Sequence, residues 1–268
     1  MTAGTIQDTA YETDGTGPPL VLVHGMGLNR ALWDWQLPFL TPHFETVRYD
    51  LLGHGDSAKP VKEYAMADFT DQLARLADGL GHDRFALAGF SLGGLIVQAF
   101  ALAHPDRVSK LAILCAGHDR SDEERAGMLD RLALAEQQGH TATIEMALER
   151  WFTDGFAARE PGVIDTVRRW MSDNDPAVYP LVYKLLATGD KPLAQAIANI
   201  SCPTLVLACE EDHGNSPAMA RRMAELIPDA RAAIVPKLRH MGLAEDPDAI
   251  ARELAPFLQG SVACSTPI

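Results

Sequence analysis

The stretch from Arg84 to Pro105 constrains the fold of this chain more than any other. It contains Gly89-Phe90-Ser91-Leu92-Gly93, a G-x-S-x-G pattern. Residues 85–88 form a short apolar run typical of a buried strand, whereas the apolar residues after the pattern recur at helical spacing. We therefore expect Ser91 at a tight strand-to-helix turn, where glycines relieve the backbone and the helix offers N-terminal amides to an anion. A glycine-rich turn with a capping serine is the alternative.

Strands and helices alternate on both sides of this stretch. Apolar runs predict further strands at 19–23, 44–49, 110–116, 203–209 and 230–235. Amphipathic spacing predicts a helix over 66–80 that stops at Gly81, and two later helices begin at Pro217 and at the Asp246-Pro247 pair. This alternation predicts an α/β fold with a mostly parallel, doubly wound sheet.

The alternation breaks between residues 120 and 198. Helical periodicity dominates there, for example at Leu129, Leu132, Ala133 and Glu136, and no strand pattern appears. The predicted organisation is therefore a core of residues 1–119 and 199–268, interrupted by a helical lid of residues 120–198. The end of the chain from Gly260 is expected to be frayed.

Charge and composition exclude several functional classes. The net charge of −13, without a dense basic cluster, argues against nucleic acid and anionic membranes as partners. The four cysteines have neither C-x-x-C pairing nor zinc-ligand spacing, so we expect reduced structural thiols and no metal site. The first residues lack a signal-peptide pattern and no apolar run reaches about 18 residues, so a cytoplasmic location is expected. The sequence leaves open a monomer or a homodimer.

Three polar residues follow predicted strands of the sheet in the order Ser91, Asp212, His240. A serine hydroxyl needs a base within hydrogen-bond reach, and that base needs an acid to orient it. Because ligands bind at the carboxyl ends of parallel strands, these residues are expected to meet at one edge of the sheet. The order is that of an α/β-hydrolase triad. Asp119, just after another strand, is an alternative position for the acid.

Two loops that follow predicted strands suggest other kinds of site. The loop Gly25-Met26-Gly27 follows a strand and could open a dinucleotide site with Asp50 as the ribose carboxylate, but Arg30 stands where the third glycine is needed. Residues 210–213, E-E-D-H, could be a metal cluster. Adjacent residues point in different directions, so a solvated loop around one working aspartate is the preferred interpretation.

The ordered motifs resemble those of the α/β-hydrolase superfamily. They are L-V-L-V-H-G (20–25), D-L-L-G-H-G-D-S (50–57), G-F-S-L-G-G (89–94), the aspartate of E-E-D-H-G-N-S-P (210–217) and the histidine of R-H-M-G-L-A-E-D-P (239–247). The chain is most similar to the branch of 3-oxoadipate enol-lactonases and carboxylesterases. Two positions depart from the family pattern, since Cys209 and Arg239 stand where glycine is usual.

The resemblance implies roles for individual residues. Ser91 would attack the acyl carbon, His240 would move the proton, and Asp212 would orient His240. The backbone N–H groups of Met26 and Leu92 would form the oxyanion hole, and no cofactor would be needed. His24 and His54 would fix loops by hydrogen bonding.

The substrate pocket is the least determined part. We predict that Trp33, His118, Trp151 and Phe152 line it, although lid packing explains the aromatic residues equally well. If the substrate is an enol-lactone acid, its carboxylate requires a cation, for which Arg150, Arg168, Arg169 and Lys184 are available in the lid.

The expected function is a serine hydrolase of a small carboxylic ester or enol-lactone, acting through an acyl-enzyme on Ser91. The expected partner is a small-molecule substrate. A carbon-carbon bond hydrolase, an amide hydrolase and a cofactor-free haloperoxidase share the same triad. A ligand receptor with slow turnover is the alternative from another class.

Overall fold

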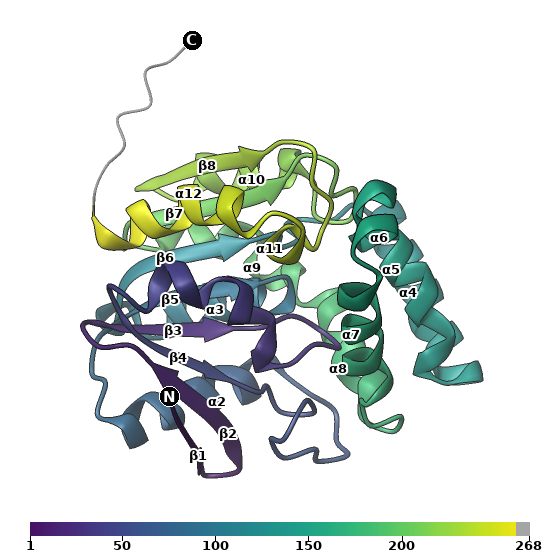
Figure 1. The fold of residues 1–268 in the computed structure, drawn as a ribbon, viewed down its shortest axis with the longest axis horizontal. Coiled ribbons are helices and arrows are strands. Elements are labelled where there is room, and N and C mark those ends of the chain that lie inside the picture. The colour runs from purple at the N-terminus through teal and green to yellow at the C-terminus, as the bar shows by residue number, and fades with distance from the viewer. Residues whose placement is uncertain (261–268) are drawn as a thin grey trace.

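The computed structural model describes residues 1–260 and has an eight-stranded sheet at its centre (Figure 1). The strand order is β1-β2-β4-β3-β5-β6-β7-β8. Strands β3 to β8 run parallel to one another, and β2 is antiparallel to both of its neighbours, β1 and β4. The bounds are β1 Thr2–Ile6, β2 Thr9–Asp14, β3 Pro19–Val23, β4 Glu45–Tyr49, β5 Phe85–Phe90, β6 Val108–Leu114, β7 Thr204–Cys209 and β8 Ala230–Val235. The predicted mostly parallel α/β fold is confirmed.

The hairpin of β1 and β2 was not predicted. It joins Ile6 to Thr9 through Gln7 and Asp8, whose φ angles are 44° and 68°. A two-residue hairpin of this kind needs positive φ at both turn positions. The sequence Gln-Asp predicts such a turn far less clearly than Asn-Gly does. Neither strand contains a continuous run of apolar residues, because both lie at the edge of the sheet and are partly exposed.

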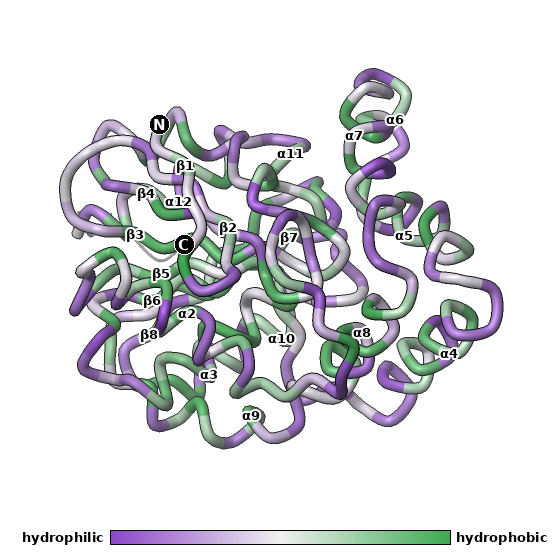
Figure 2. Tube along the Cα trace, turned by 90° about the horizontal axis from the view of Figure 1, so that it is seen from below, coloured by the Kyte–Doolittle hydropathy of each residue, from purple (hydrophilic) through white to green (hydrophobic). Residues whose placement is uncertain are grey.

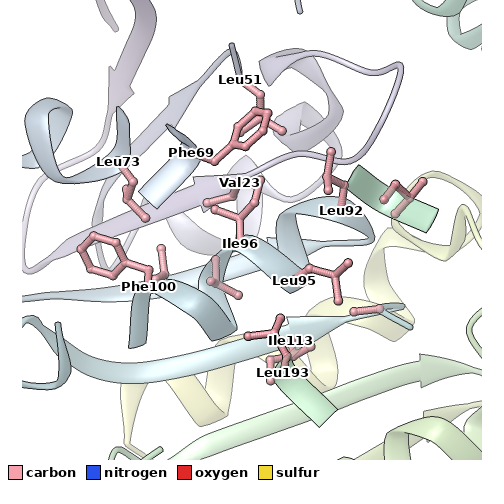
Figure 3. Packing of buried hydrophobic residues seen from close by; sticks show 14 of the residues in the cluster. Val23, Leu51, Phe69, Leu73, Leu92, Leu95, Ile96, Phe100, Ile113 and Leu193 are labelled. Carbon is pink, nitrogen blue, oxygen red and sulfur yellow. The ribbon is translucent and has the colours of Figure 1, made fainter. Parts of the chain in front are cut away.

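Helices cover both faces of the sheet. Alternate residues of β3 point to opposite faces, so that Val21 and Val23 belong to one core cluster and Leu20 and Leu22 to the other. The first face is covered by α2 (Met66–Leu80), α3 (Leu92–Ala103), α9 (Asp190–Ala196) and α10 (Pro217–Leu226). The second is covered by η1 (Arg30–Trp35), α1 (Leu37–Leu40), α11 (Gly242–Glu245) and α12 (Pro247–Gln259). Figure 3 shows the first cluster, in which Ile96 and Phe100 of α3 pack near Val23 and Leu73.

A helical segment, here called the cap, separates β6 from β7. Besides α9, it contains α4 (Asp122–Gln138), η3 (His140–Thr143), α5 (Ile144–Trp151), α6 (Asp154–Arg159), α7 (Pro161–Ser172), α8 (Tyr179–Thr188) and η4 (Ile197–Asn199). In Figures 1 and 2, helices α4 to α8 gather beyond the carboxyl ends of the parallel strands. The buried face of α4 consists of Met128, Leu132 and Ala135, and Leu129 is 41% exposed, so the stripe predicted for this helix was offset.

No helix among residues 1–260 is both long and apolar enough to cross a membrane. Apart from Gly260, which ends α12 in a left-handed conformation, the tail predicted to be frayed lies outside the described residues.

Candidate active site

The nucleophile elbow lies where β5 ends and α3 begins. Ser91 has φ 56° and ψ −113°, a conformation that costs energy for any residue with a side chain. Its N–H donates to Leu114 O of the neighbouring strand at 2.9 Å. The surrounding sheet therefore holds the strained turn in place.

Close packing explains the two glycines of the elbow. A Cβ atom at Gly89 would lie 2.2 Å from Gly93 O, and one at Gly93 would lie 2.3 Å from Val23 O. Both contacts are with backbone atoms that cannot rotate away. The glycines therefore allow α3 to start directly against β5 and β3, which positions Ser91 at the carboxyl edge of the sheet.

The loops after β7 and β8 bring Asp212 and His240 together. His240 Nδ1 lies 2.6 Å from Asp212 Oδ2, and both residues are buried. Asp212 Oδ1 accepts from the N–H groups of Gly214 and Asn215, each at 3.0 Å. This arrangement makes His240 Nδ1–H the donor and leaves Nε2 free to accept a proton.

Aromatic rings hold the imidazole of His240 from two sides. The ring of Phe90, the residue before Ser91, is centred 4.8 Å from it, and that of Trp151 in α5 is centred 5.5 Å from it. Ser91 and His240 line the same cavity. The structure thus brings the three predicted triad residues to one edge of the sheet, whereas Asp119, the alternative acid, is exposed to solvent.

A partly buried series of polar side chains that the sequence did not reveal lies between the cap and His240. Asn215 Nδ2 lies 3.3 Å from His240 Nδ1, and Asn215 Oδ1 accepts from Arg120 Nη2 at 2.9 Å. Arg120 is 6% exposed, and its guanidinium pairs with the fully buried Asp190 of α9 at 3.4 Å. The only sequence signal was the position of Asn215 three residues after Asp212, which does not distinguish it from its polar neighbours.

The predicted oxyanion loop lies against the nucleophile. A Cβ at Gly25 would be 3.1 Å from Ser91 Cβ, and Met26 lines the cavity. Leu92 is the first residue of α3, so its N–H has no acceptor within the helix. The loop that carries Met26 and the first turn of α3 therefore both lie beside Ser91.

Two neutral histidines fix this loop and its neighbour. His24 Nε2 accepts from Leu51 N and His54 Nε2 accepts from Gly27 N, both at 3.0 Å. Their Nδ1–H groups donate to the carbonyls of Gly25 and Leu52. Burial lowers the pKa of His24 to about 4 and that of His54 to about 3, so both stay uncharged at neutral pH.

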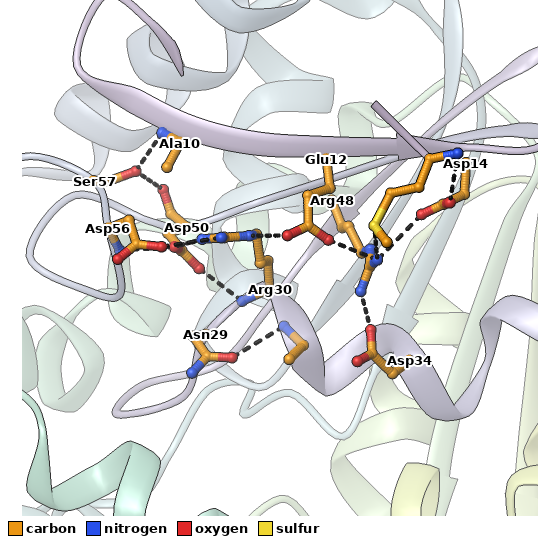
Figure 4. Close-up of polar contacts among 12 residues, drawn as sticks. Ala10, Glu12, Asp14, Asn29, Arg30, Asp34, Arg48, Asp50, Asp56 and Ser57 are labelled. Carbon is orange, nitrogen blue, oxygen red and sulfur yellow. Dashed lines mark hydrogen bonds and ion pairs between the residues drawn. The ribbon is translucent and has the colours of Figure 1, made fainter. Parts of the chain in front are cut away.

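Asp50 belongs to an ion-pair network (Figure 4). Its carboxylate accepts from Arg30 N at 2.7 Å and from Asp56 N at 2.8 Å, and it also pairs with the Arg30 guanidinium. Arg30 further pairs with Glu12 at 3.0 Å. Since the carboxylate is fully buried and occupied by protein partners, the alternative of a ribose-binding Asp50 is not supported.

Three potential metal ligands lie as close together as the ligands of a metal site do. Ligand atoms of Cys115, Asp212 and His240 lie within 4.8 Å of one another. However, Asp212 and His240 are hydrogen-bonded to each other, and the Cys209 thiol together with burial raises the pKa of the Cys115 thiol well above its usual value. Metal binding by cysteine requires the thiolate, so this chemistry favours a triad over a metal centre.

The cavity above Ser91 has a volume of about 350 Å³. Of the predicted pocket residues, Trp151 lines it and the other three do not. Trp33 is fully buried in the core, Phe152 stacks on Phe156 at 5.6 Å, and His118 is 2% exposed. The prediction that Trp33, His118 and Phe152 line the pocket is therefore corrected. Each of these residues lies near a loop of the site, but its side chain is buried in the packed interior.

Arg239 and Cys209, which stand where glycine is usual in the family pattern, each contact other residues of the chain. Arg239 Nη1 donates to Glu149 O and Phe152 O of the cap at 2.9 and 2.7 Å, and it also pairs with Asp154 at 3.0 Å. Cys209 Sγ lies 3.7 Å from Cys115 Sγ, inside the core. Arg239 therefore attaches the histidine loop to the cap.

Comparisons with known proteins agree with this geometry. Residues 18–247 match the family model of the alpha/beta hydrolase fold. The chain is 30% identical to (E)-2-((N-methylformamido)methylene)succinate hydrolase from Acinetobacter baylyi over 93% of each chain, and 27% identical to 3-oxoadipate enol-lactonase 2 from the same organism over 91% of each. An enol-lactonase structure from Burkholderia xenovorans superposes with a TM-score of 0.87 at 29% identity, covering 96% of this chain and 99% of that one. This chain belongs to the α/β-hydrolase family.

Proposed function

We propose that the protein is a serine hydrolase that cleaves a small carboxylic ester or lactone through an acyl-enzyme on Ser91. The observation that carries the proposal is the His240–Asp212 pair, with Nδ1 2.6 Å from the carboxylate, lining one cavity with Ser91. Relatives whose names describe enol-lactonase and methyl ester esterase activities support the substrate class.

In this mechanism His240 Nε2 takes the proton of the Ser91 hydroxyl as its oxygen attacks the carbonyl carbon. The negative charge that develops on the carbonyl oxygen is stabilised by the N–H groups of Met26 and Leu92, each worth about 3 kcal/mol in the transition state. His240 then gives the proton to the departing alcohol oxygen. Water, deprotonated by the same imidazole, attacks the acyl-enzyme and releases the acid.

The cavity favours a small acyl group. Its volume of about 350 Å³ is near the lower end of the range for ligand pockets, which is about 300–1,000 Å³. Met26, Met128, Ala147 and Leu186 supply apolar wall beside the polar groups. We infer that the cap, rather than the core, determines which substrates reach Ser91.

Replacing the nucleophile tests the proposal. Ser91→Ala should reduce hydrolysis of a neutral activated ester at least about a thousandfold, while leaving thermal stability close to wild type. Ser172→Ala, which changes an exposed cap serine, is the control and should retain activity. Near wild-type turnover by Ser91→Ala would refute the mechanism.

Pre-steady-state kinetics separate an enzyme from a receptor on the same fold. The hydrolase predicts a burst of alcohol release followed by sustained turnover, because both acylation and deacylation use His240. A single burst without steady turnover would identify the slow receptor instead.

A further inference from the structure

Two arginines of the cap face the cavity without an acidic partner. Arg131 lies on α4 and Arg150 on α5, and both line the cavity that contains Ser91 and His240. Among the ion pairs formed within residues 1–260, none involves either side chain. What distinguishes Arg131 and Arg150 from the other arginines without an ion pair is that both line this cavity.

The other three cationic candidates of the cap do not line the cavity, and one of them, Arg169, donates to Thr166 on the surface at 3.1 Å. Arg168 pairs with Glu145 at 2.6 Å and Lys184 pairs with Glu63 at 2.9 Å, both on the surface. Arg120 also borders the cavity, but Asp190 balances its charge.

Glu123 and Glu124 of α4 also line the cavity, and Glu124 accepts from Ser121 N at the start of that helix at 2.8 Å. Among the cations that line the cavity, those without an ion pair within residues 1–260 are Arg131 and Arg150.

Tyrosines of α8 complete this part of the wall. Arg131 Nε donates to the hydroxyl of Tyr183 at 3.1 Å, which fixes one edge of its guanidinium. Tyr179 and Tyr183 both line the cavity and are buried. Tyr183 thus holds Arg131 in position without neutralising it.

The two guanidiniums act on each other. The pKa of Arg150 is lowered, first by the partial loss of surrounding water and then by the positive charge of Arg131. Since arginine stays protonated, this repulsion persists at all ordinary pH values. An anion between the two side chains would relieve it and would form charge-assisted hydrogen bonds with planar donors suited to a carboxylate.

We propose that Arg131 and Arg150 form a carboxylate subsite, and that the substrate is an ester or lactone that bears a free carboxylate away from the bond to be cleaved. This inference rests on the proposed function, because it specifies the substrate class of the same cavity. The carboxylate binds at the cap wall while the ester carbonyl reaches Ser91 below. Neutral esters of the same size lack this contact and bind more weakly.

Matched esters of one diacid test the subsite. Monomethyl succinate carries a carboxylate at pH 7.5, and dimethyl succinate does not. We expect the wild-type kcat/KM to favour the monoester at least about tenfold. Arg150→Gln should lower the monoester-to-diester ratio about tenfold, mainly through KM, because it removes a charge-assisted hydrogen bond to the carboxylate. Arg131→Gln should act in the same direction.

Arg168→Gln is the matched control, because it removes a cap arginine that does not line the cavity. It should leave the monoester-to-diester ratio unchanged. A wild-type preference for the diester would overturn the proposal. So would an Arg150→Gln variant in which both substrates lose kcat/KM by the same factor, since that result indicates a structural role.

A binding measurement separates failure of the subsite from failure of the proposed hydrolase. Calorimetry with succinate and the Ser91→Ala variant requires no turnover, and the further change Arg150→Gln should weaken binding about tenfold. If esters are hydrolysed without preference for the carboxylate and succinate does not bind, only the subsite is wrong. If succinate binds through Arg150 but Ser91 supports no hydrolysis, only the reaction is wrong.

Discussion

The floor and the roof of the active-site cavity are held in place in different ways. The floor consists of the elbow at Ser91 and the loop of Met26, and the core packs directly around it through glycines and neutral histidines. The roof is the cap, whose helices α4, α5 and α8 line the cavity. It packs on the core through apolar side chains such as Val182 and is further attached by polar contacts such as those of Arg239. Backbone atoms therefore leave no room for a side chain at the glycines of the floor, whereas the exposed glycines of the roof have open space around them.

This difference predicts opposite responses to the same substitution. Gly93→Ala in the floor should cost about 3–5 kcal/mol or prevent folding, because its Cβ would lie 2.3 Å from Val23 O. Gly162→Ala in the roof should be neutral or stabilising by up to about 1 kcal/mol, because no atom lies within 4 Å of the new Cβ and alanine favours the helix. Urea denaturation of both variants measures the difference.

Equal effects of the two glycine substitutions would contradict the comparison. In that case the elbow would tolerate a shift of α3 away from the sheet. Activity of any folded Gly93→Ala protein provides a second measurement, since displacement of α3 moves Ser91 and Leu92 together.

The difference between floor and roof also explains which parts of the site could be predicted from the sequence. The elbow, its strand and its helix are contiguous in the chain, so period and glycine position were enough to place Ser91. The triad could be assembled because parallel strands end at one edge of the sheet. These steps required only local pattern and the topology of the sheet.

The cavity wall could not be predicted because it is made of side chains from separate helices. Trp33 was assigned to the pocket from its residue type, but the turn of η1 buries it in the core. Choosing Arg150 among the cationic residues of the cap required knowing that Arg168 and Lys184 have partners distant in sequence. Such pairings depend on tertiary contacts that carry no local signal.

The attachment of roof to floor is tested at Arg239. Arg239 directly precedes His240 in the chain. Arg239→Ala removes its three contacts with residues 149, 152 and 154 of the cap. We expect kcat to fall about three- to tenfold with a loss of roughly 1 kcal/mol in stability, since the freed carbonyls are partly exposed and can bind water. Arg231→Ala, which removes an exposed pair with Glu253, is the control and should change kcat by less than about twofold.

Because Arg239 acts through His240, the pH dependence of kcat distinguishes positioning from loss of stability. A mobile histidine loop should change the pH profile of kcat as well as its maximum. An Arg239→Ala enzyme with lower thermal stability but unchanged kcat and pH profile would show that the roof does not position the triad.

The two neutral histidines of the floor also predict a pH dependence of stability. In the folded protein the pKa is about 4 for His24 and about 3 for His54, against 6.5 for both without burial. The unfolded chain therefore binds more protons below pH 6.5, so stability from these neutral histidines is present above pH 6.5 and is lost as the pH falls toward the folded values. At pH 5.5 the loss amounts to about 1.4 kcal/mol for each histidine.

Urea denaturation between pH 7.5 and 5.5 measures this loss. His54→Gln should reduce the slope of unfolding free energy against pH, because it removes one of the three histidines with a lowered pKa, which are His24, His54 and His118. His43→Gln, at an exposed position, should leave the slope unchanged. A slope that is flat in the wild-type protein, or that responds equally to both substitutions, would mean that the loops of Met26 and Leu51 are not held by neutral histidines and that the floor is less rigid than its packing implies.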